Sequence, residues 1–210
     1  MQYHLMYLSL FIFTFLITLL LIPFIKRIGL RYKFLDFPDK RKSKFHIPKV
    51  RIGGLAFFIS YLISLAFFII FFYFKRDYLI DKELLSLIVI TSSGFFAIGF
   101  ADDKFSLSPI WRLFLQYFLA VLISIKGFSI STIDLSFLGL PFNSIQIPQL
   151  ASIIITSTWI VGIINAINWI DGMDGLAAGC SFIMFITLFL ISYLNNQLFL
   201  GVIAIIFSAI

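Results

Sequence analysis

Four polar residues recur at every third position within one short apolar stretch of the chain. Asn165, Asn168, Asp171 and Asp174 belong to the sequence NAINWIDGMDGLAAG at 165–179. On a helix they would follow one slowly drifting stripe. Their carboxylates can face a metal ion, and the backbone N–H groups of a glycine-rich turn can face a phosphate or a carbonyl group. The stretch therefore predicts a site for a metal ion and a phosphorylated ligand.

The glycines of this stretch oppose a continuous helix. Gly172 and Gly175 favour a helix end that opens into a turn. Residues 135–170 and 175–210 contain no Asp, Glu, Lys or Arg, so the two carboxylates lie between long uncharged sequences. The alternative interpretation is a solvated turn between two membrane helices that uses Asp and Gly as turn formers. An EF-hand is excluded because DGMDG lacks the alternating oxygen ligands and the final Glu of that loop.

The composition indicates a protein that crosses a membrane several times. Hydrophobic residues make up 61% of the chain, which includes 28 Phe, and charged residues make up only 12%. The one cysteine, Cys180, excludes an intrachain disulfide. The net charge of +6 comes largely from one short basic segment, which favours membrane orientation over nucleic-acid binding. We therefore expect the lipid bilayer as a partner and no nucleic acid.

Uncharged apolar stretches predict the helices of an all-α transmembrane bundle, organised as one membrane domain over 1–210. A helix needs about 20 apolar residues to cross the hydrocarbon core. Arg112 is acceptable in the fourth span if it lies near enough to the interface to snorkel. Pro and Asn residues favour a short hairpin or interfacial loop over 128–147. The predicted spans are 5–25, 52–74, 84–101, 105–125, 149–167 and 176–194, and 198–210 begins a seventh helix.

The distribution of basic residues predicts the orientation. The segment 26–51 holds ten of the sixteen Lys and Arg residues, and Lys104 and Arg112 bring that side to twelve. Four lie on the other side: Lys75, Arg76, Lys82 and Lys126. By the positive-inside rule the amino terminus is outside. The expected cytoplasmic loops, at about 26–51, 102–108 and 168–175, bring three polar elements to one face.

The second polar element is the sequence GFADDKFSLSP, which contains Asp102 and Asp103. Adjacent carboxylates repel each other unless a cation joins them, so the pair suggests a Mg²⁺ site or a base aimed at a substrate. The alternative is a solvated helix end that Lys104 partly neutralises.

The third polar element is RKSKFHIPKVRIGG. Its Lys and Arg side chains can hold lipid phosphates or a nucleotide diphosphate, and Gly53 and Gly54 allow a ligand to approach the backbone closely. The alternative is the positive-inside signal itself, and His46 is best interpreted as an ordinary loop residue. Together, the three elements indicate phosphoryl-group transfer at a membrane surface.

These three segments, in this order, resemble the polyprenyl-phosphate N-acetylhexosamine-1-phosphate transferases, which are glycosyltransferases of family 4. The stretch WIVGIINAINWIDGMDGLAAG is most similar to the branch that transfers N-acetylglucosamine 1-phosphate to undecaprenyl phosphate. The resemblance implies a Mg²⁺-dependent enzyme, with Mn²⁺ as an alternative metal. Such an enzyme moves N-acetylhexosamine 1-phosphate from a UDP-sugar to undecaprenyl phosphate, releases UMP, and starts the synthesis of cell-envelope polysaccharides such as O-antigen and teichoic acid.

The resemblance also implies roles for individual residues. Asp102 would engage the lipid phosphate as a catalytic residue, and Asp103 would be its acidic catalytic partner near the metal ion. Asp103 and Asp171 would be metal ligands. The substrate-binding residues that it implies are Asn168, Asp171, Gly172, Met173, Asp174 and Arg51. The implied location is the bacterial inner membrane, with the active site on the cytoplasmic face.

The chain departs from the family pattern in two respects. His46 stands two residues before Pro48, one residue closer than in relatives. Family members also have further spans, a later metal-binding Asp and a His-rich loop, so we expect this chain to be an amino-terminal portion that does not turn over substrate alone. The alternatives are an ion-coupled carrier and an inactive fragment. The identity of the sugar and the oligomeric state, with a homodimer among the options, stay open at this stage.

Overall fold

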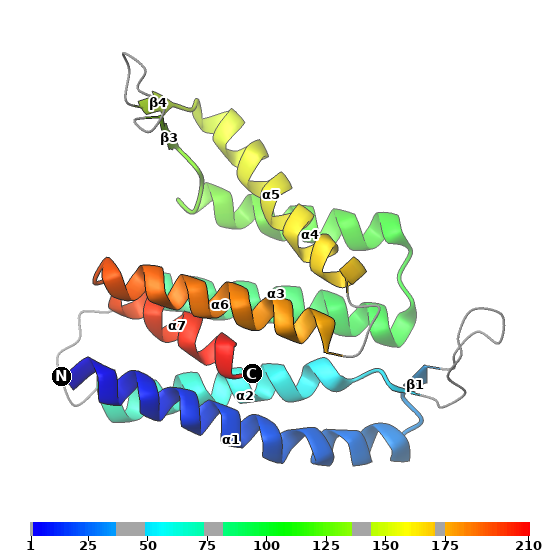
Figure 1. The fold of residues 1–210 in the computed structure, drawn as a ribbon. Helices are drawn as coiled ribbons and strands as arrows, with labels where there is room; N and C mark the ends of the chain where they lie inside the picture. The colour runs from blue at the N-terminus through cyan, green and yellow to red at the C-terminus, as the bar shows by residue number, and fades with distance from the viewer. Residues whose placement is uncertain (1, 37–48, 74–81, 136–143, 171–174) are drawn as a thin grey trace. The chain divides into compact units, whose positions relative to one another are not determined.

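The computed structural model describes residues 2–36, 49–73, 82–135, 144–170 and 175–210 (Figure 1). These residues form two compact units. Unit 1 comprises Met1–Lys82 and Gly175–Ile210, and unit 2 comprises Glu83–Asp174. In the described part, five helices are long and apolar enough to cross a membrane. The predicted all-α polytopic class is therefore confirmed.

Unit 1 is a bundle of four helices, one of which ends in a π-helical segment. The helices α1 and α2 lie side by side and antiparallel (Figure 1). The short helix α7 packs against α1, α2 and α6. The elements are α1 (Gln2–Arg31), α2 (Gly53–Phe68), its π-helical continuation η1 (Ile69–Tyr73), α6 (Leu176–Leu194) and α7 (Leu198–Ala209).

The helix α7 is the most buried element of unit 1. Val202 and Ile206 are fully buried, and Tyr7 of α1 donates a hydrogen bond from Oη to the carbonyl oxygen of Leu198, at 3.2 Å. A Cβ atom on Gly201 would lie 2.8 Å from Tyr7 Oη, so only glycine allows this close approach. The helix predicted from residue 198 is thus confirmed, and its burial explains why an apolar sequence persists there.

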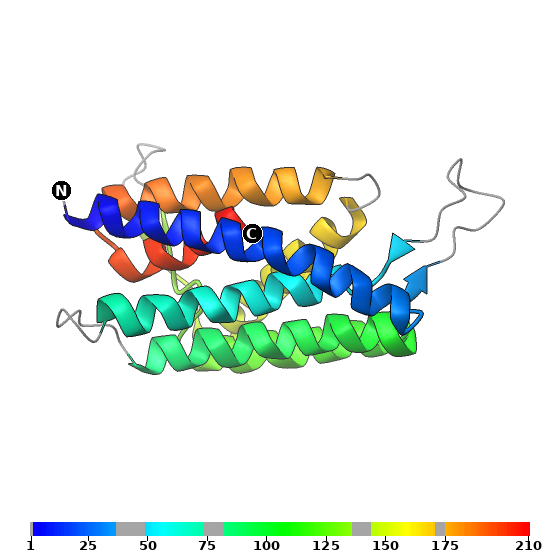
Figure 2. The same cartoon turned by 90° about the horizontal axis from the view of Figure 1, so that it is seen from below.

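A short antiparallel strand pair joins α1 to α2. It consists of β1 (Leu35–Asp36) and β2 (Lys49–Val50), which extend beyond the ends of the two helices (Figure 2). The backbone N–H of Arg51 donates to the carbonyl oxygen of Phe34 at 3.1 Å, which closes the pair at its base. His46 and six of the sixteen basic residues used to predict the orientation lie outside the described residues.

Unit 2 consists of three helices and a β-hairpin. The helices α4 and α5 pack against each other, and the hairpin joins them with Ile133 opposite Ile145. A hairpin predicted over 128–147 is therefore present. The elements are α3 (Lys82–Phe105), α4 (Pro109–Ile125), β3 (Thr132–Asp134), β4 (Ser144–Gln146) and α5 (Gln149–Ile170).

Every predicted span is a helix, but three of them are longer than predicted. The helix α1 covers Gln2–Arg31 rather than 5–25. The helix α3 continues to Phe105 rather than ending at 101, and α5 continues to Ile170 rather than 167. Asp102, Asp103 and Asn168 therefore lie on helices and not in loops. Polarity alone does not end a helix, because a charged last turn can remain helical where it leaves the apolar core. With 17 residues, α4 is about 26 Å long, at the lower limit for a membrane span.

Candidate active site

The turn between α3 and α4 is built from the residues FSLSP. Ser106 adopts a left-handed conformation with φ of 50°, and its N–H donates to the carbonyl oxygen of Asp102 at 2.8 Å, which ends α3. Ser108 caps α4, because its side chain accepts from the backbone N–H of Trp111 at 3.4 Å. Pro109 follows at the first helical position, where a missing N–H is harmless. This turn brings the first turn of α4 back to the last turn of α3.

An ion pair joins the two helices across this turn. Arg112 Nη1 donates to Asp102 Oδ2 at 2.9 Å, and the two side chains are 24% and 25% exposed. An arginine–carboxylate contact of this length is a charge-assisted hydrogen bond, and partial burial reduces screening by water. From the sequence alone, Arg112 was expected only to be a basic residue near the interface. The sequence signal for the pair was Ser108-Pro109, which lies between the carboxylate and the arginine and predicts the start of a new helix after a turn.

Asp103 has surroundings that differ from those of Asp102. Adjacent helical residues point about 100° apart around the axis, so the two carboxylates cannot share one direction while α3 is helical. Asp103 is exposed. Within the described ranges, no three His, Cys, Asp or Glu side chains cluster to hold a metal ion. Mg²⁺ needs only one or two protein carboxylates when phosphates and water complete its shell, so the exposed oxygen donors at this end of α3 suit it in kind.

A buried amide pair joins α4 to α5. Asn165 Nδ2 donates to Gln116 Oε1 at 2.7 Å and to the carbonyl oxygen of Val161 at 2.9 Å. Asn165 is 8% exposed and Gln116 is 6% exposed. Polar contacts between membrane helices stabilise their packing by roughly 0.6–2 kcal/mol. Asn165 was predicted as a member of the polar stripe, but Gln116 was not predicted. The available signal for Gln116 was an amide inside an otherwise apolar helix.

Asn168 lies three residues after Asn165 and is exposed near the end of α5. Trp111 lies in the first turn of α4 and Trp169 in the last turn of α5, and they are 63% and 78% exposed. Tryptophan is enriched at membrane–water interfaces, where its ring is apolar and its N–H needs a polar partner. In a protein that crosses a membrane, these two tryptophans place this end of unit 2 at a membrane surface.

The structure brings together part of the predicted site. Asp102 and Asp103 on α3 lie at the same end of unit 2 as the Asn165 end of α5, through the contacts of Arg112 and Gln116. Arg51 is exposed and belongs to unit 1, so its approach to these residues stays a prediction. The remaining predicted site residues lie outside the described residues: Asp171, Gly172, Met173 and Asp174.

Gly175 begins the second half of the glycine-rich stretch. Its φ of 83° is the left-handed conformation that favours glycine, and it precedes the first residue of α6. The carbonyl oxygen of Gly175 accepts the N–H of Gly179 at 2.9 Å. The helices α5, which ends at Ile170, and α6, which begins at Leu176, thus flank the predicted turn, whose residues 171–174 lie outside the described residues.

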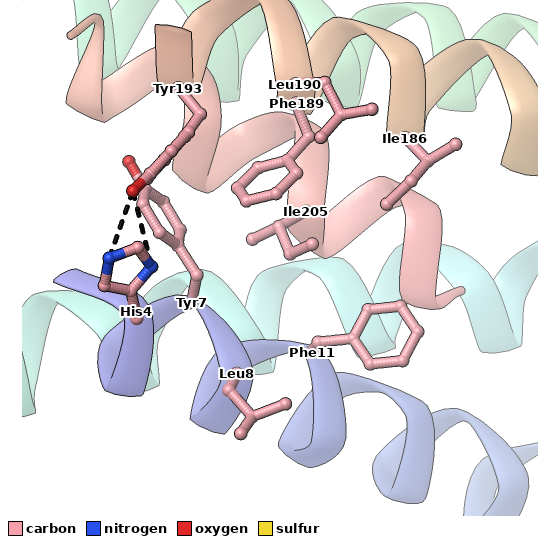
Figure 3. Close-up of a pocket in the computed structure, with 9 residues that line it drawn as sticks. All are labelled: His4, Tyr7, Leu8, Phe11, Ile186, Phe189, Leu190, Tyr193 and Ile205. Carbon is pink, nitrogen blue, oxygen red and sulfur yellow. Dashed lines mark hydrogen bonds between the residues drawn. The ribbon is translucent and has the colours of Figure 1, made fainter. Parts of the chain in front are cut away.

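A separate pocket of about 400 Å³ lies in unit 1 between α1, α6 and α7 (Figure 3). Tyr193 Oη lies 3.1 Å from His4 Nε2 at one end, and the rest of the wall consists of Tyr7 and of leucine, isoleucine and phenylalanine side chains. None of the predicted site residues that the structure describes lines it.

Comparison with known proteins identifies the family. The sequence model of glycosyl transferase family 4 matches residues 84–210, which is more than half of the chain. The chain belongs to glycosyl transferase family 4. The match includes α3, α4 and α5, and with them the Asp102–Arg112 ion pair and the Gln116–Asn165 hydrogen bond. The resemblance inferred from the three polar segments is thereby confirmed at the level of the family.

Two relatives show how much of a family protein the chain represents. A Bacillus subtilis protein described as a probable undecaprenyl-phosphate N-acetylglucosaminyl 1-phosphate transferase is 32% identical over 175 residues, 82% of this chain and 44% of that protein. The phospho-N-acetylmuramoyl-pentapeptide-transferase of Staphylococcus saprophyticus is 31% identical over 206 residues, 92% of this chain and 61% of that protein. The chain thus spans less than two thirds of the length of either relative.

Proposed function

We propose that the protein containing this chain transfers an N-acetylhexosamine 1-phosphate group from a UDP-sugar to undecaprenyl phosphate. Membership of the family supports this, as do the relatives named for undecaprenyl-phosphate N-acetylglucosaminyl 1-phosphate transfer and phospho-N-acetylmuramoyl-pentapeptide transfer. N-acetylglucosamine is our first choice of sugar, because the stretch at 159–179 resembles that branch most. The product is a lipid-linked diphospho-sugar that starts a cell-envelope polysaccharide.

One observation supports this function above the others: the ion pair of Asp102 with Arg112 lies at a tryptophan-marked end of unit 2, beside the end of α5 that carries Asn168. An enzyme that joins a membrane lipid to a water-soluble nucleotide needs its polar groups at a membrane surface. A carrier that moves ions across the bilayer would instead place acidic groups near the middle of a span. Asp102 and Asp103 lie in the last turn of α3, which favours the transferase.

In the proposed reaction, an oxygen of the lipid phosphate forms a bond to the β-phosphorus of the UDP-sugar. The bond between that phosphorus and the oxygen bridging to the α-phosphate breaks, and UMP leaves with the electron pair. Arg112 would reduce the repulsion between Asp102 and an approaching phosphate by holding a positive charge beside the carboxylate. Its Nε atom is buried and has no hydrogen-bond partner among the described residues.

The remaining residues would bind the metal ion and the donor. Asp103 and Asp171 would hold Mg²⁺, or Mn²⁺ in its place, and the ion would neutralise the charge of the diphosphate. Asn168 would contact the nucleotide from the end of α5, and Arg51 would approach the substrate from the basic segment. The other proposed substrate-binding residues are Asp171, Gly172, Met173 and Asp174.

The proposed setting is the bacterial plasma membrane, with the amino terminus outside and the active site facing the cytoplasm. The twelve-to-four division of basic residues supports this orientation. A cytoplasmic site would meet its nucleotide-sugar donor in the cell interior and its lipid acceptor in the inner leaflet.

The test uses membranes that carry the complete protein in which this chain occurs. They are incubated with undecaprenyl phosphate and, separately, with labelled UDP-N-acetylglucosamine, UDP-N-acetylgalactosamine and UDP-N-acetylmuramoyl-pentapeptide. We expect UMP and labelled lipid with the first donor, loss of both with EDTA, and recovery with Mg²⁺ or Mn²⁺. Transfer from another donor would change the sugar assignment, whereas no transfer from any donor would refute the function.

A further inference from the structure

One face of α4 holds both neighbouring helices at the candidate site. Arg112 and Gln116 are four residues apart, so they lie on the same side of the helix. Arg112 contacts Asp102 of α3 at 2.9 Å, and Gln116 contacts Asn165 of α5 at 2.7 Å. One helical turn of α4 therefore contacts both the last turn of α3 and the last turns of α5.

The amide pair lies inside the apolar part of the structure. Gln116 is about 10 Å beyond the start of α4, and Asn165 is about 8 Å before the end of α5, at a rise of 1.5 Å per residue. A pair of leucines would fill such a space without a polar group that needs a partner. An amide pair is instead directional, because it is satisfied only when its donor and acceptor face each other, and buried polar contacts of this kind can specify one register between helices.

The direction of Asn165 determines the direction of Asn168. Three residues along a helix return to within about 60° of the starting direction, one short step along the axis. A rotation of α5 that turns Asn165 away from Gln116 would therefore turn the exposed Asn168 by the same angle. It would also change where the chain enters the glycine-rich stretch that follows Ile170.

The other end of the same helix pair offers a comparison. Ser124 Oγ and Ser157 Oγ lie 3.4 Å apart. Each serine is eight residues from the amide residue on its own helix, which is about 12 Å along the helix axis. Both serines are buried, and Ser124 Oγ also donates to the carbonyl oxygen of Ala120 at 2.8 Å. The contact between Ser124 and Ser157 lies far from the site. Its removal should therefore weaken the packing of α4 against α5 without rotating the end of α5 that carries Asn168.

We propose that Gln116 is a positioning residue for the transfer reaction. By accepting the hydrogen bond of Asn165, it sets the rotation of the last turns of α5 and thereby the direction in which Asn168 meets the nucleotide. The inference rests on the proposed function for its consequence in catalysis, but the positioning itself is a property of the helix pair. Asn165 is then a support of the site and not a ligand of the substrate.

An exchange of the two amides tests the catalytic consequence in the complete protein. Gln116→Asn makes the pair one methylene too short, and Asn165→Gln makes it one methylene too long. We expect each single change to lower kcat/KM per folded protein by about 10-fold or more, because small misplacements of a substrate-binding group reduce the rate strongly. The double exchange restores the total length, so it should return kcat/KM to within about 3-fold of the wild-type value.

Two matched variants exclude a general effect of weaker packing. Ser124→Ala removes the distant contact between α4 and α5, and Tyr117→Phe removes the exposed bond from Tyr117 Oη to Thr158 Oγ1, at 3.4 Å. Both should retain wild-type kcat/KM. A double exchange as inactive as the single variants would overturn the proposal, as would single variants that match Ser124→Ala.

A spin label reads the position of the α5 end without any substrate. Cys180 is changed to Ser, and a nitroxide is attached at Asn168→Cys or, as the control, at Leu150→Cys near the start of α5. Gln116→Met should broaden the range of motion of the label at 168 and leave the label at 150 unchanged. An unchanged label at 168 would contradict the positioning role. If the wild-type protein transfers no sugar, the proposed function fails, and this spectrum still decides the role of Gln116.

Discussion

Arg112 Nη1 and Asp102 Oδ2 lie 2.9 Å apart across the turn that separates α3 from α4. The pair places a permanent positive charge beside the carboxylate to which the resemblance assigns the lipid phosphate. If a phosphate group approaches Asp102, this guanidinium is the described group that offsets the repulsion most directly.

The first prediction concerns this guanidinium. Arg112→Gln should lower transfer by about 10- to 100-fold, because it removes a preorganised charge from a partly desolvated site. Arg112→Lys keeps the charge but loses the planar guanidinium group, so its activity should lie between that of the wild-type protein and that of Arg112→Gln. Lys126→Gln, at the exposed opposite end of α4, is the control and should leave transfer unchanged. The measurement is labelled lipid formed per amount of folded protein. Wild-type transfer by Arg112→Gln would show that the ion pair serves only the fold.

The second prediction concerns the carboxylates. Asp102→Asn, Asp171→Asn and Asp174→Asn keep the size of the side chain and remove its charge, so each should reduce transfer by about 100-fold or more if these groups hold the metal-bound diphosphate. Asp134→Asn in β3, at the opposite end of unit 2, should have little effect. The amount of each variant in the membrane is measured by immunoblot. Full activity of the Asp171 and Asp174 variants would mean that this stretch is only a turn.

Much of the fold could be predicted because the bilayer imposes a simple rule. Each crossing helix needs a long run of apolar residues, so the uncharged stretches ending near residues 25, 74 and 194 marked helices directly. The hairpin over 128–147 was predictable from Pro and Asn residues that interrupt an apolar tract. Helix ends were less predictable, because α3 ends at the left-handed backbone of Ser106 and not at the carboxylates before it.

The partners within the site could not be predicted in the same way. Asp102 and Asp103 attract attention because charges are rare in this sequence, but their separate surroundings depend on which side of α3 meets α4. Gln116 is one amide in an apolar helix, and the sequence around it does not indicate that Asn165, 49 residues away, is its partner. Such a pairing depends on the rotation of two helices about their axes, which a pattern of apolar residues restricts only loosely.

The third prediction tests the orientation of unit 2. In a Cys180→Ser background, a cysteine at Ser106, in the α3–α4 turn, should react with a membrane-impermeant thiol reagent only from the cytoplasmic side. A cysteine at Ser144, in β4, should react only from the outside, because the two exposed positions lie at opposite ends of α4. Intact cells are compared with inverted membrane vesicles. Reaction of both positions from one side would mean that α4 does not cross the bilayer.

The last prediction concerns the close contact between α1 and α7. A methyl group on Gly201 would lie 2.8 Å from Tyr7 Oη, and the ring cannot move away easily because Tyr7 is 5% exposed and packs edge-on against Phe189 at 5.0 Å. Gly201→Ala should therefore destabilise the protein by about 1–3 kcal/mol, although the same change usually stabilises a helix interior. The expected decrease in Tm, measured by circular dichroism in detergent, is about 3–10 °C.

The control and the rescue use the same chemistry. Gly179→Ala in α6 adds the same methyl group where no described atom lies within 4 Å, so its Tm should stay the same or rise. Tyr7→Phe removes the oxygen with which the new methyl group collides, at the cost of its 3.2 Å bond to Leu198. The double variant Tyr7→Phe, Gly201→Ala should then be less destabilised than the sum of the two single changes. Additive losses in the double variant would show that the steric explanation is wrong.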